Sequence, residues 1–497
     1  MVRKVWVVLS LLLIATLVLG ACAQPTPKVV KETVVVTKEV EKVVTKEVQK
    51  VITKEVEKVV TKEVKVVATP TPVPEEPITL KVWIMPNGPD PLGAMQEEAK
   101  EFQKLHPNVT VEVEVLDWGA AWPKITTAAT SGEGPDISQL GTTWTASIAA
   151  MGALRPFTKD EIAAMGGPDN FVEASWKTCN PVGSGFTVAV PWFVDTRAVL
   201  YRKDLYKKAG VDPNTAFDTW ETFDAALAKL KEAKEKGLIN AYPIGFPGKN
   251  DWNVLHNFAP WVWEAGGDLL NPGNTAAVFN SPEAIKGVKF YASLYTKGYT
   301  PPDVLELNSA QVEGLFINGE IATIISGPWM VKGARTPNDK GGWADSEAAK
   351  NLGAHEIPAG PAGRYTFVGG SNLTVWNSSK HPEMAVEFVK FLVSKDSQIR
   401  YSSNIGMLPA VKAALADPTF SEDPLYSVFV SAVEHGKSYP AIPAWGAIEN
   451  VMVKALGALW DDVAGVNGPF DPDTMIPARL NQAKQEVDAL LAVGGGQ

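Results

Sequence analysis

Two stretches near the start of the folded part of the chain determine its class: ITLKVWIM at 78–85 and VTVEVEV at 109–115. The first predicts a strand, and the second alternates apolar and polar side chains with the period of a strand. Between them, residues 93–105 carry apolar side chains at helical spacing, which predicts a helix. PDISQL at 135–140 predicts a short, buried third strand. Strands that alternate with helices indicate parallel sheets and therefore an α/β fold.

The rest of the folded part repeats this pattern. Residues 219–236 predict a long amphipathic helix, and residues 381–394 predict another that follows a strand at 372–376. Residues 322–325 predict a further short buried strand. The folded part begins near Ile78 and has about 420 residues, which is more than one hydrophobic core usually supports. We therefore predict two hinged lobes, each a mostly parallel sheet flanked by helices, with a ligand bound at strand ends between them.

The composition argues against several classes of function. The chain has 46 basic and 56 acidic residues and a formal net charge of −10, whereas nucleic-acid binding depends on clustered positive charge. Five histidines and two cysteines leave few residues for zinc or thiol chemistry. Cys179 has no partner for a disulfide framework, and a buried apolar role is favoured over a reactive thiol. The 16 tryptophans are the unusual feature and require an explanation.

The N-terminus has the pattern of a targeting signal. Two basic residues precede an uncharged run at 5–19, which suits a signal peptide better than a membrane-spanning helix. The run ends in LGAC at 19–22, which resembles the lipobox of bacterial lipoproteins. That resemblance implies that residues 1–21 are removed and that the sulfur of Cys22 carries a diacylglyceryl group. An ordinary signal peptide with an incidental cysteine and an uncleaved anchor are the alternatives.

A repetitive segment separates this signal from the folded part. Octads similar to TKEVEKVV repeat across 28–65, and ATPTPVPEEP at 68–77 follows as a proline-rich hinge that joins neither a helix nor a sheet. Abundant Glu–Lys pairs at short spacing slightly favour a helical or coiled-coil stalk, and a solvated, disordered tether is the alternative. In either form, residues 22–77 are predicted to be a lipid-anchored spacer.

Known catalytic motifs are missing from the sequence. It contains no HExxH, no paired CxxC and no GxSxG, and GKS at 436–438 lacks the first glycine of a phosphate-binding loop because position 431 is Ser431. Adjacent acids such as Asp461 and Asp462 do not form the facing carboxylates of a glycosidase, although folding can bring distant acids together. We therefore predict a protein that is not an enzyme, with no catalytic residues, no cofactor and no metal.

Six stretches occur in a fixed order along the folded part. They are PDI at 135–137 with GTTW at 141–144, VPWFVDTRAVLYRKDLYKKAG at 190–210, TWETF at 219–223, FINGEIATIISGPWM at 316–330, FVGGSNLTV at 367–375, and HPEMAVEFVKFLVSKDSQIRY at 381–401 with NIGMLPAV at 404–411. Together they resemble family 1 extracellular solute-binding proteins, the maltose-binding-protein-like, sugar-binding components of ABC importers. The resemblance covers about 78–465 and implies a two-lobed, type II periplasmic-binding-protein-like fold. By family topology, lobe 1 is 78–190 plus 355–395, and lobe 2 is 191–354 plus 396–497.

A sugar ring has apolar C–H faces and a rim of hydroxyl groups, so its recognition needs flat aromatic side chains beside planar polar ones. This chain repeatedly places tryptophan beside polar residues or in loops, which would account for its tryptophan content. The positions are Asp117 with Trp118, Trp192 near Asp195 and Arg197, Asp251 with Trp252, Trp329 after Gly327 and Pro328, and Trp445 after Pro443 and Ala444.

The family pattern implies which residues bind the ligand. Trp144, Trp329 and Trp445 are the predicted stacking residues, and core or lobe packing is the alternative for each. Asp195 lies where the family often places a hydroxyl-binding carboxylate, and a salt bridge to Arg197 is its alternative. The other predicted ligand-binding residues are Asn87 and Asp90, which are equally explained as turn formers, Trp118, Trp122, Thr143, Trp192, Arg197, Asp251, Trp252, and Gly370, Ser371 and Asn372 in a flexible loop before a strand.

These features predict a lipid-anchored solute receptor of an ABC importer on the outer face of the bacterial cell membrane. It would capture a carbohydrate, most simply an oligosaccharide, by hinge closure and deliver it to membrane permease subunits. A receptor for a polyamine, glycerophosphodiester or peptide is one alternative, since an acidic body with many tryptophans also suits a cation. A surface-anchored glycoside hydrolase or adhesin is the other.

Overall fold

A computed structural model describes residues 76–249 and 251–494. The predicted signal peptide, the lipidated Cys22 and all but the last two residues of the predicted spacer lie outside the described residues. The described part belongs to one compact unit. Within it, no helix combines the length and the apolar character that crossing a membrane requires.

The larger of two sheets has seven strands and contains the strands predicted at 78–85, 109–115 and 135–140. β1 runs parallel to both β2 and β3, as predicted from the alternation of strands and helices. β8 lies antiparallel between β3 and β4, and β9 is antiparallel to β4. In spatial order the strands are β2 (Val109–Val115), β1 (Ile78–Ile84), β3 (Ile137–Gly141), β8 (Thr366–Val375), β4 (Val190–Thr196) and β9 (Leu408–Pro409), and β10 (Gly436–Lys437) pairs with β8.

The smaller sheet has three strands in the order β6 (Thr323–Ser326), β5 (Ala198–Arg202), β7 (Leu352–His355), and both pairings are antiparallel. The prediction of mostly parallel sheets is therefore wrong for this sheet, and in the larger sheet it holds for β1 with β2 and β3 and for β10 with β8. β5 is the central strand of the smaller sheet, and β6 and β7 both run in the opposite direction on either side of it. Arg197 alone separates β4 from β5, so the chain passes directly from one sheet to the other.

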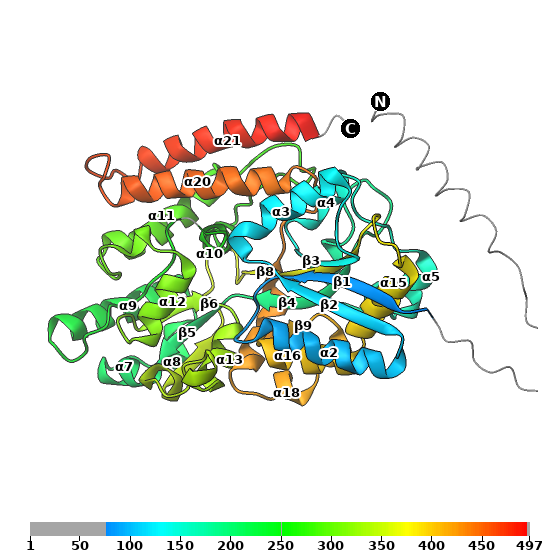
Figure 1. The fold of residues 1–497 in the computed structure, drawn as a ribbon. Coiled ribbons are helices and arrows are strands. Elements are labelled where there is room, and N and C mark those ends of the chain that lie inside the picture. The colour runs from blue at the N-terminus through cyan, green and yellow to red at the C-terminus, as the bar shows by residue number, and fades with distance from the viewer. Residues whose placement is uncertain (1–75, 250, 495–497) are drawn as a thin grey trace, which may run out of the picture. The chain divides into compact units, whose positions relative to one another are not determined.

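Helices cover both sheets. Figure 1 shows α3 and α4 on one face of the larger sheet, α2 and α16 on the other, and the long helices α20 and α21 side by side. The helices are α2 (Pro91–Leu105), α3 (Trp118–Ser131), α4 (Thr145–Ala150), α5 (Lys159–Ala164), α6 (Glu173–Lys177), α7 (Lys203–Lys208), α8 (Pro213–Ala216), α9 (Trp220–Glu235), α10 (Asn253–Glu264), α11 (Pro282–Thr296), α12 (Ser309–Ile317), α13 (Trp329–Arg335), α14 (Glu347–Lys350), α15 (Pro382–Leu392), α16 (Lys395–Ile405), α17 (Lys412–Leu415), α18 (Pro418–Ser421), α19 (Tyr426–Ala432), α20 (Trp445–Val463) and α21 (Met475–Gly494).

The predicted long helices are confirmed, with small differences at their ends. α9 begins after Thr219, whose hydroxyl accepts from the backbone N–H of Thr222 in a capping box. α15 ends at Leu392 rather than at 394, because Ser394 caps the next helix by accepting from the backbone N–H of Ser397. The predicted lobe boundaries stay a prediction.

The predicted loop at 370–372 is wrong, because β8 already begins at Thr366 and all three residues lie inside the strand. Gly370 has a φ of 118°, and a Cβ built on it would lie 2.1 Å from the carbonyl oxygen of Phe193 in β4. A glycine at this position is therefore required for β8 and β4 to pair closely, and the Gly-Gly-Ser sequence is not a sign of flexibility here.

Replacing Gly370 with alanine is expected to lower the free energy of unfolding by about 2–4 kcal/mol, because the added methyl group meets the Phe193 carbonyl. Urea unfolding followed by circular dichroism measures the change. Gly314 in α12 is the matched control, since no described atom lies within 4 Å of its added Cβ. Gly314→Ala should keep or raise stability by about 1 kcal/mol. Equal midpoints for wild type and Gly370→Ala would contradict this role.

Candidate ligand-binding site

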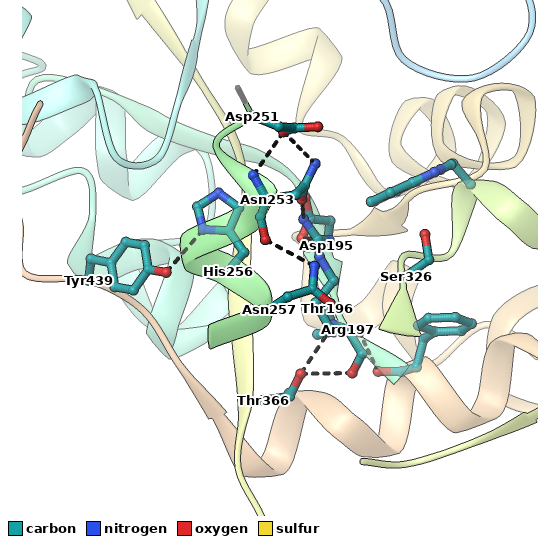
Figure 2. Close-up of polar contacts among 12 residues, drawn as sticks. Asp195, Thr196, Arg197, Asp251, Asn253, His256, Asn257, Ser326, Thr366 and Tyr439 are labelled. Atoms are coloured by element: carbon teal, nitrogen blue, oxygen red, sulfur yellow. Dashed lines mark hydrogen bonds and ion pairs between the residues drawn. The ribbon is translucent and has the colours of Figure 1, made fainter. Parts of the chain in front are cut away.

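Arg197 lies at the junction of the two sheets and is buried, with 3% of the residue exposed. Its Nη1 donates to Oδ1 of Asp195 over 2.7 Å, and its Nη2 donates to Oδ1 of Asn253 over 2.5 Å. Its backbone carbonyl accepts from the Thr366 hydroxyl at the start of β8. Figure 2 shows these groups converging from β4, α10 and β8. Side chain and backbone together fix this cation at the point where the chain changes sheets.

The carboxylate of Asp195 is the partner that allows this burial. Burial raises the pKa of Asp195, and the Arg197 guanidinium opposes that shift. A buried cation without a counterion would cost several kcal/mol. The salt bridge between Asp195 and Arg197, which was the alternative role predicted for Asp195, is present. Part of the Asp195 side chain remains exposed.

Asp251 organises the start of α10. Its Oδ1 accepts from the backbone N–H of Asn253 over 2.9 Å and from the Asn253 side chain over 3.2 Å. Its Oδ2 accepts from the backbone N–H of Ser309 over 2.8 Å and from the Ser309 hydroxyl. Asp251 thereby ties α10 to α12, and Asn253 links it to Arg197. Asn253 was not predicted from the sequence, although an Asp that accepts from the backbone N–H two residues later is a local signal for a turn.

Trp329 begins α13 and lies over the same cation. The guanidinium carbon of Arg197 is 4.8 Å from its ring centroid, so this cation lies over one face of the ring. The indole N–H donates to Oε1 of Glu313 over 2.9 Å, and the Ser326 hydroxyl donates to the same oxygen over 2.8 Å. Burial raises the pKa of Glu313. The sequence analysis missed Glu313, because only the fold brings α12 against this ring.

A small pocket lies among these groups, and its polar lining consists of Arg197, Asn253, Asn257, Ser309, Glu313 and Ser326, beside Trp329 and apolar neighbours. Its volume of about 10 Å³ is enough for one water molecule at most. A sugar ring would therefore require the surrounding elements to move apart.

Trp144, which is 2% exposed, lies at the centre of a cluster of four tryptophans. Trp118 and Trp122 from α3 meet Trp144 edge-on, with ring centroids 5.6 Å and 5.3 Å away. Trp252 approaches from the start of α10, with its centroid 6.2 Å away. Because Trp252 lies between Asp251 and Asn253 in the chain, the tryptophan cluster adjoins the polar network around Arg197. The fold thus brings together predicted residues that are far apart in the sequence.

Trp445 begins α20 and is buried against Tyr439, with ring centroids 4.7 Å apart and planes tilted by 30°. The hydroxyl of Tyr439 is hydrogen bonded to Nδ1 of His256 over 3.0 Å, as Figure 2 shows. Burial lowers the pKa of His256 well below its ordinary value, which favours the neutral ring. One turn further along α20, burial raises the pKa of Glu449 to about 8, and the Thr143 side chain opposes that shift.

Several predicted residues have structural partners instead. Trp192 is fully buried in the core under the larger sheet and stacks on Tyr401 with centroids 4.4 Å apart. Asn87 is buried and donates to the carbonyl of Met85 and to Gln139. Asp90 is exposed and caps α2 by accepting from the backbone N–H of Gly93. These contacts account for the three residues without a ligand.

The same holds for two residues of β8. Ser371 accepts from the side-chain amide of Gln139 over 2.8 Å. Asn372 donates to the hydroxyls of Thr145 and Thr178 over 3.0 Å and 2.9 Å. Both are buried, and their contacts hold β8 against the neighbouring elements.

Cys179 is buried as well, and burial raises the pKa of its thiol well above the ordinary value. In the part of the chain that the structure describes, no group of three or more His, Cys, Asp or Glu is placed to hold a metal ion.

Comparison with known proteins agrees with this architecture. The model of the family described as bacterial extracellular solute-binding protein matches residues 86–399. A diacetylchitobiose-binding protein of Streptomyces coelicolor is 29% identical over 378 residues, which cover 75% of this chain and 82% of that protein. A putative binding protein of Brucella abortus is 27% identical over 403 residues, which cover 80% of this chain and 89% of that protein.

A solved structure gives the same result for the fold. The structure of the sugar-binding protein MalE from the phytopathogen Xanthomonas citri superposes with a TM-score of 0.68 and 27% sequence identity. The match covers 83% of this chain and 97% of that one. The two-lobed, periplasmic-binding-protein-like α/β fold predicted from the sequence is therefore confirmed.

Proposed function

The chain belongs to the bacterial extracellular solute-binding protein family, and we propose that it is the receptor of an ABC importer that captures a carbohydrate outside the cytoplasm. Its relatives include a diacetylchitobiose-binding protein and a sugar-binding protein of the same fold. Members of this family are binding proteins, and we propose that this chain likewise binds its ligand without converting it.

The observation that carries the proposal is that the tryptophan cluster around Trp144 adjoins the polar network around Arg197, because Trp252 lies between Asp251 and Asn253 in the chain. Indole rings offer flat apolar surfaces to the C–H faces of a sugar, and the amide and carboxylate groups nearby pair with its hydroxyls. A site for a small anion would instead need unpaired basic groups, whereas the guanidinium of Arg197 is already paired with Asp195.

The mechanism follows from the connection between the sheets. β4 and β5 are joined through Arg197 alone, which makes this junction a natural hinge. A ligand that contacts the Trp144 side in every state, and the Trp329 side only when the lobes close, would favour the closed state by that difference in contacts. The closed, loaded receptor would then deliver the sugar to the membrane subunits of the permease.

Attachment to the membrane completes the proposal. A lipid on Cys22 would hold the receptor on the outer face of the cell membrane, and residues 22–77 would space the folded part from it.

If Cys22 carries this lipid, wild-type protein should sediment with membranes after expression in a bacterial host, and Cys22→Ser should be recovered in the soluble or secreted fraction. Both should bind ligand equally, because the folded part begins more than 50 residues later. Membrane association of Cys22→Ser that equals the wild type would rule out the lipid anchor.

A panel of glycans tested by thermal shift examines the ligand class. A ligand present at a hundred times its Kd stabilises the folded state by about 2.7 kcal/mol, so a cognate oligosaccharide should clearly raise Tm. Recovery of the intact sugar afterwards would agree with binding, and cleaved sugar would indicate a hydrolase. Stabilisation by polyamines, glycerophosphodiesters or peptides alone would reject the carbohydrate.

The stacking assignment predicts that Trp144→Ala and Trp329→Ala each weaken binding of that oligosaccharide by about tenfold to a hundredfold, which is about 1.4–2.8 kcal/mol. Isothermal titration calorimetry measures the loss. Trp460→Phe is the control, since Trp460 is fully buried against Phe246 and Tyr291, away from the cluster. Wild-type affinity in both alanine variants would refute the stacking role.

A further inference from the structure

Glu449 differs from the other buried acids of the described chain. The side chain of Glu449 is fully buried, and neither carboxylate oxygen has a partner at hydrogen-bonding geometry among the described residues, although the Thr143 side chain is near enough to lower its pKa. The other buried acids are all paired: Glu98 with Ser397 and Arg400, Asp136 with Lys81 and Ser379, Glu264 with Trp220 and Tyr365, and Asp462 with Asn467 and Arg479. An unpaired buried carboxyl costs stability, so its presence calls for a function.

The surroundings of Glu449 place it beside the tryptophan cluster. It lies one helical turn after Trp445 and Gly446, and a Cβ built on Gly446 would lie 2.9 Å from the ring of Trp122. The backbone N–H of Gly446 donates to the hydroxyl of Ser147 in α4, so the start of α20 is held against the segment that carries Trp144. Because Glu449 is fully buried, a ligand could reach its carboxyl only if the surrounding elements moved apart.

A second polar group lies on the same face of α20. The indole N–H of Trp445 finds no acceptor within the described residues. Taken alone this carries no weight, because the indoles of Trp192, Trp261 and Trp460 also leave their N–H unpaired in the core. The Glu449 carboxyl can accept hydrogen bonds and, when protonated, can also donate one. The indole N–H of Trp445 supplies a second donor beside it.

We propose that Glu449 and the Trp445 indole recognise an uncharged substituent of the sugar that both donates and accepts hydrogen bonds. A ring hydroxyl and an acetamido group share this chemistry. A ligand cation is disfavoured, because the unpaired indole N–H of Trp445 one turn away is a donor and cannot accept a hydrogen bond from a cation. The inference rests on the proposed carbohydrate function and assigns a specificity-determining residue within it.

The test uses the whole protein with Glu449 replaced by methionine or by glutamine. Glu449→Met removes an unpaired buried polar group and keeps its length, so Tm without ligand should rise by about 2 °C or more. The affinity for sugar should at the same time fall tenfold or more. Glu449→Gln keeps both a donor and an acceptor, so its affinity for a neutral sugar should stay within about threefold of wild type.

Asp462 supplies the matched control. It is buried on the same helix, about 20 Å further along, and it is paired with Arg479. Asp462→Leu should therefore lower Tm and leave the affinity for sugar unchanged. A lower Tm for Glu449→Met with unchanged affinity would overturn the inference, because that result is the signature of a structural carboxylate.

The ligands are maltose, cellobiose and diacetylchitobiose as neutral sugars and deacetylated chitobiose as a cation, each followed by calorimetry. If wild type prefers diacetylchitobiose over cellobiose and Glu449→Met does not, the acetamido group is the partner. If Glu449→Met loses affinity for both sugars equally, a hydroxyl is the partner. Binding of deacetylated chitobiose alone, abolished in Glu449→Gln, would overturn the neutral assignment. Absence of binding to every sugar by wild type would reject the proposed function itself.

Discussion

A buried guanidinium at the junction of the two sheets is the constraint on which the candidate site depends. Arg197 is the single residue between β4 and β5, and its charge is stable there only because Asp195 and Asn253 accept its hydrogen bonds. Those partners fix other elements in turn. Asn253 is held by Asp251, which also binds the start of α12, and the ring of Trp329 lies over the same cation. One charged side chain is thus linked, directly or through Asn253 and Asp251, to the starts of α10, α12 and α13.

Local patterns predicted much of this fold. The alternation of VTVEVEV and the helical spacing at 93–105 correspond to β2 and α2 nearly residue for residue, because local periodicity reflects which face of each element is buried. The direction of the strands was less predictable. β8 follows β7 of the smaller sheet in the chain and then enters the larger sheet. There it pairs antiparallel with β3 and β4, which lie far from it in the sequence.

The candidate site could be predicted only in part for the same reason. Trp144 and Trp192 both follow or occupy strands beside polar residues, yet one lies at the centre of the tryptophan cluster and the other lies in the core under the sheet. Gly370 has the composition of a loop but is a contact point between strands. Glu313 and Glu449 acquire their importance from tertiary contacts and from burial, which no spacing in the sequence reveals.

The position of β8 also bears on how the chain reaches its native state. β8 fills the space between β3 and β4, although nearly 170 residues separate it from the end of β4. On a nascent chain emerging N-terminus first, β3 and β4 would present facing edges with unsatisfied backbone groups until residue 375 became available. Such late, long-range closure makes acquisition of the native state slow.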